Sequence, residues 1–207
     1  MPDATIVPPA PALGDVAARQ LRPAAAALIG ALVGITWAAG LRAYMAALVG
    51  QGSVFSWSTL ASILIPGAIA GACLGLAHAL RDHRSRRVWL LGLAPFAFAV
   101  LTLLEPGALV ALLTAGLGGG SIAVPALLVL GGFGLGTIGP RIARIACLSL
   151  ALLLTVGIAA TVPGVGGDRL ALSAPQGVWA MVLVVGLLLT GMLGTALAFR
   201  PAVRAGR

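Results

Sequence analysis

The chain alternates between long apolar stretches and short polar clusters, and this pattern predicts its elements. An apolar stretch of about 17 to 22 residues is long enough to cross a hydrocarbon layer of roughly 30 Å as a helix. The sequence contains stretches of this kind that together predict a bundle of six membrane-crossing helices. They cover residues 24–41, 60–80, 88–104, 122–138, 142–162 and 178–199.

Composition supports a membrane environment. Of the 207 residues, 60% are hydrophobic and 9% are charged, and the mean hydropathy is +1.09. Soluble domains carry about 25% charged residues. Within lipid, backbone polar groups must be paired inside the protein, which leaves helices or closed barrels, and barrel strands would show shorter, alternating segments. We therefore expect an all-α, polytopic transmembrane bundle.

The distribution of arginine predicts the orientation. All 13 basic residues are arginines, and in a six-span arrangement eleven of them fall on one side. The positive-inside rule makes that side cytoplasmic, together with both termini. Basic loops beside anionic lipid head groups account for the net charge of +8, so no nucleic-acid partner is expected. The predicted head-group contacts are Arg81, Arg84, Arg86 and Arg87 in the loop "RDHRSRR".

The chain is expected to form one transmembrane domain with two tails. Residues 1–22 are rich in proline and alanine and are expected to be a disordered cytoplasmic tail. Residues 23–200 form the helical domain, and residues 201–207 form a basic cytoplasmic tail. The first span is expected to be an uncleaved signal anchor.

Arg42 and Glu105 are the charged residues that the pattern singles out. Arg42 lies in "TWAAGLRAYM", roughly 28 Å along a helix that starts at Pro23. Glu105 lies at nearly the same depth at the end of the third span. Either the two side chains anchor separately at the membrane interface, or they pair or line one outward-facing polar cavity.

Small residues recur every four positions in the first two spans. Gly30 and Gly34 lie on one stripe, and Gly67, Gly71 and Gly75 form a GxxxGxxxG motif. Small residues at this spacing allow helices to approach closely. We predict a glycine zipper that packs helices within the chain, with a homodimer face as the alternative.

The segment between the third and fourth spans is apolar but too short to cross. It runs through "GLGGGS", where Gly116, Gly118, Gly119 and Gly120 could form the hinge of a re-entrant hairpin or the wall of a cavity. The alternative is an interfacial loop. A seventh crossing here would place Arg141, Arg144 and the arginines after the last span on the side opposite the other basic loops.

Three common enzymatic motifs do not occur in the sequence. There is no HExxH, no GxSxG and no GxxxxGK[ST], and the five acidic residues are scattered. We therefore expect no enzyme, no metal site and no cofactor.

The first part of the chain combines Trp37 and Arg42 in "TWAAGLRAYM" with "FSWST" from Phe55 to Thr59 and an arginine cluster. In this combination the chain resembles uncharacterised multi-pass integral membrane proteins of actinobacterial type. The resemblance implies a bacterial plasma membrane and carries no activity. Two function classes stay open. The first is a small transporter or permease-like protein with an outward-facing polar site. The second is a non-catalytic accessory or scaffold subunit of a larger membrane complex. The expected partners are membrane lipids and either further copies of the chain or a larger membrane complex.

Overall fold

The computed structural model describes residues 22–81, 88–104, 106–115 and 120–200, and this part of the chain is helical without strands. The elements, in order, are α1 (Pro23–Val49), η1 (Gly50–Gly52), α2 (Trp57–Ala79), η2 (Val88–Phe96), α3 (Ala97–Leu103), α4 (Ala108–Ala115), α5 (Gly120–Leu135), α6 (Arg141–Gly166), η3 (Gly167–Leu170), α7 (Pro175–Ala196) and η4 (Leu197–Phe199).

Four helices, α1, α2, α6 and α7, are long and apolar enough to cross a membrane. Pro23 and Pro175 lie in the first turns of α1 and α7, where the missing N–H of proline costs nothing. The N-terminus of α2 is capped by Ser56, whose hydroxyl accepts a hydrogen bond from the backbone N–H of Thr59 at 3.1 Å. These features indicate an all-α membrane protein.

The expected third and fourth spans differ from regular long helices. Residues Val88–Phe96 form a 3₁₀ helix that continues into the short α3, and α5 has 16 residues. Gly92 and Pro95 are weak α-helix formers within η2. The chain bends by 105° between Val88–Leu103 and the eight-residue α4. The described structure thus has four long apolar helices, or five if the bent pair is one span.

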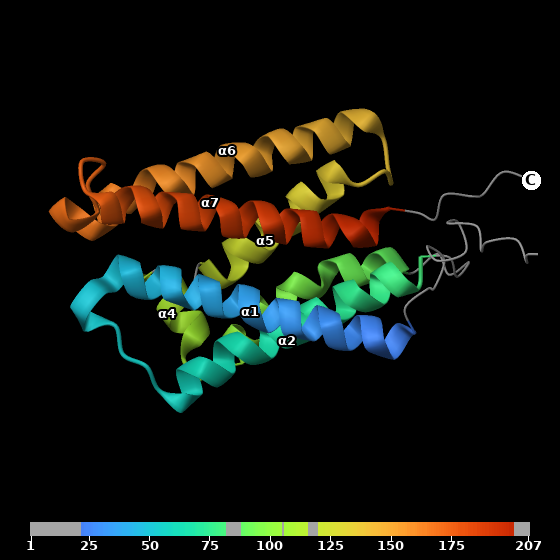
Figure 1. Cartoon of the computed structure of the whole chain (residues 1–207), viewed down its shortest axis with the longest axis horizontal. Coiled ribbons are helices and arrows are strands. Elements are labelled where there is room, and N and C mark those ends of the chain that lie inside the picture. Colours follow the sequence, from blue (N-terminus) through green and yellow to red (C-terminus); the bar gives the residue numbers. More distant parts are fainter. Residues whose placement is uncertain (1–21, 82–87, 105, 116–119, 201–207) are drawn as a thin grey trace, which may run out of the picture.

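The elements are arranged around α5 and α7 (Figure 1). Helices α1 and α2 pack against each other, and α6 and α7 form an antiparallel pair, with α5 packed against both α6 and α7. The start of α1, the end of α2, the start of α6 and the end of α7 all lie at one end of the bundle. We call this the arginine-rich end, because Arg22, Arg81, Arg141, Arg144 and Arg200 occupy these positions.

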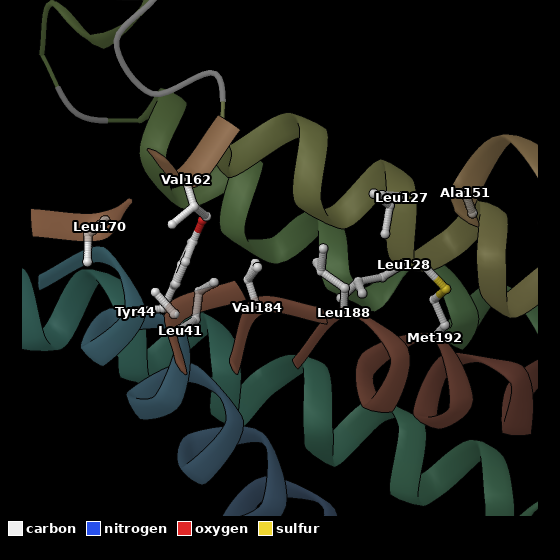
Figure 2. Close-up of a cluster of buried hydrophobic side chains, with 11 residues drawn as sticks. Leu41, Tyr44, Leu127, Leu128, Ala151, Val162, Leu170, Val184, Leu188 and Met192 are labelled. Atoms are coloured by element: carbon white, nitrogen blue, oxygen red, sulfur yellow. The ribbon is translucent and has the colours of Figure 1, made fainter. Parts of the chain in front are cut away.

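The buried core is centred on α7 (Figure 2). Val184, Leu188 and Met192 follow one another at four-residue spacing on one face of this helix and are at most 2% exposed. They belong to a cluster that includes Tyr44 of α1 and Leu127 of α5. The core therefore connects the α6–α7 pair to both α1 and α5.

Glycines allow α5 to fit closely between its neighbours. A Cβ atom on Gly132 would lie 2.7 Å from the Cβ of Thr195 on α7, and one on Gly134 would lie 2.6 Å from the Cβ of Leu148 on α6. Real side chains do not approach so closely. Glycine at these positions is what lets the short α5 occupy the interior of the bundle.

Candidate functional site

Arg42 is buried on α1 and holds the segment that follows the helix. Its guanidinium Nη2 donates to the Oγ of Ser53 at 3.1 Å and to the carbonyl of Val54 at 2.8 Å. The guanidinium carbon also lies 4.2 Å from the ring centroid of Phe55, within the range of a cation–π contact. Arg42 is only 9% exposed, so its side chain is packed within the protein and does not extend freely from the surface.

The expected pairing of Arg42 with Glu105 stays a prediction, because Glu105 lies outside the described residues. The partners that the structure does give Arg42 are a hydroxyl, a carbonyl and an aromatic ring from the connection to α2. Helix α1 extends to Val49, beyond the expected end at residue 41. The connection after η1 then turns back along the helix and reaches Arg42.

A second arginine, Arg169 of η3, caps the end of α1. Its Nη1 donates to the carbonyl of Ala47 at 2.7 Å, and its Nη2 donates to the carbonyl of Leu48 at 2.9 Å. Carbonyls in the last turn of a helix have no partner within the helix, and a cation there also interacts favourably with the helix dipole. Gly50, with φ of +71°, leaves space for this guanidinium, since a Cβ would lie 3.1 Å from its central carbon.

Glycines of α1 and α2 form a contact between the backbones of the two helices. A Cβ on Gly71 would lie 2.9 Å from the carbonyl carbon of Gly30 and from the Cα of Gly34. A Cβ on Gly67 would lie 2.8 Å from the carbonyl oxygen of Gly34, and Gly75 faces the carbonyl of Ala26 in the same way. Glycine hydrogens therefore point at carbonyl oxygens of the facing helix, a geometry that favours weak Cα–H···O contacts.

An apolar groove of about 750 Å³ lies beside this contact. We call it the lateral groove. Its walls are the stretch between Ala26 and Trp37 on α1, the stretch between Gly67 and His78 on α2, and residues between Leu187 and Leu197 on α7 and η4. Pro95, Phe98 and Leu128 line it as well. Its size is in the range of small-molecule sites.

A smaller cavity of about 230 Å³ lies beyond the lateral groove, toward the opposite end of the bundle. Its polar lining consists of Ser62, Thr102 and Ser121, and Gly120 at the start of α5 also borders it. Arg42 lines neither this cavity nor the groove. Among the described residues, neither lining includes an arginine or a carboxylate.

Trp37 stands between the two cavities. Trp37, Phe98 and Leu128 line both. The rings of Trp37 and Phe98 meet edge to face, with centroids 6.1 Å apart and an angle of 69° between the planes. The indole Nε1 donates to the carbonyl of Leu187 on α7 at 2.7 Å. We call Trp37 and Phe98 the aromatic partition, because their ring contact joins α1 to α3 at the level where the indole hydrogen bond joins α1 to α7.

The remaining predicted site residues are placed in part. Gly120 begins α5, with no atom close to the position of a Cβ, whereas Gly116, Gly118 and Gly119 lie outside the described residues. Arg81 follows α2, and its Nε donates to the carbonyl of His78 at 3.2 Å. Arg84, Arg86 and Arg87 also lie outside the described residues.

Sequence reasoning missed the aromatic partition and the Arg169 cap. The one signal for the partition is the position of Trp37 in the middle of its span, unlike Trp57, Trp89 and Trp179, which lie near element ends. Within the described part of the chain, no group of three His, Cys, Asp or Glu side chains is arranged to hold a metal ion. Comparison of the chain with family models, with curated proteins and with solved structures finds no match.

Proposed function

We propose that this protein is a small transporter of the bacterial plasma membrane that moves a mainly apolar molecule. The observation that carries the proposal is the succession of two cavities along the bundle, separated by the aromatic partition of Trp37 and Phe98. A scaffold subunit needs external contact surfaces, whereas a transporter needs an internal route with a barrier. Two cavities that share one aromatic wall fit the second requirement.

The proposed topology has six crossings. A 3₁₀ helix rises about 2.0 Å per residue, so Val88–Leu103 extends over roughly 28 Å despite its 16 residues. Helix α5 extends over about 24 Å, and a thinner local bilayer can accommodate a span of this length. The region around α4 is then a re-entrant or interfacial segment.

The proposed orientation places the arginine-rich end in the cytoplasm. Its arginines gather beside four helix ends, in keeping with the positive-inside rule. Trp57 and Trp179 are exposed near the opposite end, and Trp89 is exposed at the start of η2, positions that suit two aromatic belts. The lateral groove then faces the cytoplasmic half of the membrane, and the smaller cavity faces the outer half.

This geometry changes the proposed polar site. The hydroxyl groups of Ser62, Thr102 and Ser121 supply the polar lining of the outward cavity, while Arg42 stabilises the α1–α2 connection. Glu105 remains a candidate for this cavity on the basis of its position in the sequence.

Side-specific thiol labelling tests the route. In a background with Cys73→Ala and Cys147→Ala, a Ser62→Cys variant is exposed to a membrane-impermeant thiol reagent in right-side-out and inside-out vesicles. We expect labelling from the outer side. A small apolar thiol reagent should label the same position faster once Trp37→Ala opens the partition. Leu153→Cys, on the exposed apolar face of α6, is the control and should stay unlabelled.

The proposal fails if Ser62→Cys reacts from neither side, with or without Trp37→Ala, in protein that elutes as a single folded species. Mass spectrometry of the intact, gently extracted protein addresses the accessory role. A stoichiometric protein partner would assign the chain to a larger complex instead.

A further inference from the structure

The lateral groove has the length of one membrane leaflet. On α1 its lining runs from Ala26 to Trp37 and on α2 from Gly67 to His78, which at 1.5 Å per residue is about 16 Å on each helix. Half of a hydrocarbon core of roughly 30 Å is close to that length. The groove begins near the arginine-rich end and stops at the aromatic partition.

The groove is open to its surroundings along one side and apolar within. Ile29, Leu32 and Val33 of α1 line it and are between 49% and 63% exposed. Gly194 of α7 borders open space within the groove, because a Cβ there would come no closer than 3.9 Å to a carbon of Leu74. In a bilayer this opening faces the acyl chains of the lipid.

Positive charge lies where the groove meets the arginine-rich end. His78 lines the groove, and the guanidinium of Arg81 is held against its carbonyl. That bond uses one of the five N–H donors of an arginine. Arg200 follows Leu197, which lines the groove from the α7 side. Guanidinium groups bind phosphate oxygens well.

We infer that the lateral groove binds an acyl chain of a phospholipid with an anionic head group, with the phosphate beside Arg81. Three features carry this: an apolar groove of leaflet length, an opening toward lipid, and arginines where the head group would lie. Binding itself is independent of transport, but identifying this lipid as the transported substrate rests on the function proposed above.

Photo-crosslinking in liposomes tests the assignment. The protein is reconstituted in phosphatidylcholine vesicles with a small fraction of phosphatidylglycerol that carries a diazirine on one acyl chain. Phosphatidylcholine with the same diazirine chain is the matched probe. After irradiation, we expect adducts of the phosphatidylglycerol probe on the groove walls of α1 and α7. Adducts distributed evenly over the exposed face of α6, or equal yields for the two probes, would overturn the inference.

Two variants with one control make the test specific. Gly194→Leu fills the groove and should remove the adducts, whereas Gly186→Leu should keep them, because Gly186 is exposed on the same helix with open space around it. Arg81→Gln changes a residue beyond the end of α2 and should lower the preference for the anionic probe about fivefold. An arginine near an anionic lipid surface contributes about 1 kcal/mol of attraction, which corresponds to that factor.

Unchanged adducts in Gly194→Leu, or an unchanged preference in Arg81→Gln, would contradict the inference. An absence of lipid adducts from the groove walls, in protein that mass spectrometry shows to be a dimer, would assign the groove to contact with a second copy. If the adducts form but Ser62→Cys cannot be labelled, the groove is a lipid site and the transport proposal fails. If the labelling succeeds without adducts, the transported molecule is a different one.

Discussion

The contact between α1 and α2 leads to a prediction for Gly71→Ala. The new Cβ would lie 2.9 Å from the carbonyl carbon of Gly30 and from the Cα of Gly34, and it would overlap the Gly30 carbonyl oxygen. Carbon atoms in contact are normally about 3.5 to 4.0 Å apart. The atoms that the new Cβ would contact are backbone atoms of α1, which cannot rotate away as a flexible side chain could. The helices must therefore separate by about 1 Å to restore normal contact.

The cost follows from this separation. Overpacking of a close contact typically costs about 1 to 3 kcal/mol, and a gap of 0.5 to 1 Å forfeits roughly a quarter to a half of the dispersion energy of neighbouring pairs. Replacing glycine by alanine within a helix returns up to about 1 kcal/mol. We expect Gly71→Ala to be destabilised by about 1 to 2 kcal/mol net.

Gly157→Ala is the matched control. Gly157 lies within α6, is exposed, and has no atom within 4 Å of a Cβ position. The same substitution there gains helix propensity without a clash, so stability should be unchanged or higher by up to about 1 kcal/mol.

Thermal unfolding in detergent micelles, followed by tryptophan fluorescence, compares the two variants. The Tm of Gly71→Ala should fall by about 2 to 8 °C, at roughly 2 to 4 °C per kcal/mol for a chain of this size. The double variant Gly30→Ala with Gly71→Ala should lose less than the sum of the two single variants, because helices already moved apart accept the second methyl group. A Tm for Gly71→Ala at or above that of Gly157→Ala would refute the close contact.

Two further predictions concern Arg42 and Arg169, which lie toward the end of the bundle opposite the arginine-rich end. Arg169→Gln removes the hydrogen bonds to the carbonyls of Ala47 and Leu48. Because Arg169 is exposed, we expect the stability of the last turn of α1 to fall by only about 1 kcal/mol, measured as faster amide hydrogen exchange there. Unchanged exchange would contradict the capping role of Arg169. Arg42→Gln removes the hydrogen bonds to Ser53 and Val54, so a protease should cleave the α1–α2 connection faster than in the unmodified chain. Equal cleavage rates would show that Arg42 does not keep this connection in place.

The class of the protein could be predicted because a hydrocarbon layer imposes local constraints. Each crossing must be apolar over most of its length, so α1, α2, α6 and α7 are visible as long apolar stretches with few charges. Most of the described arginines lie at or near helix ends for the same reason, and Arg42, within α1, is the exception. Small residues every four positions are equally local, and the structure places Gly30 and Gly34 opposite Gly67 and Gly71.

The partners of individual side chains could not be predicted in this way. Arg42 binds atoms of a connection whose path depends on where α1 ends, and Arg169 reaches a helix more than 120 residues earlier in the sequence. The 3₁₀ winding of η2 was also missed, since an apolar stretch shows the same composition in either helix type. These features depend on tertiary contacts that no single stretch of sequence contains.

The burial of Arg42 changes where selectivity should be sought. A charged site would select a substrate by its charge, but the hydrogen bonds of Arg42 and Arg169 go to the connection after α1 and to its last turn. Among the described residues, the linings of the two cavities offer hydroxyl groups, one histidine and apolar surface. Such linings discriminate by shape and by apolar contact. In the proposed transporter, passage between the cavities would depend on Trp37, whose hydrogen bond to Leu187 joins α1 to α7 between the two cavities. Substitutions of Trp37 should therefore alter the proposed transport more directly than substitutions of Arg42.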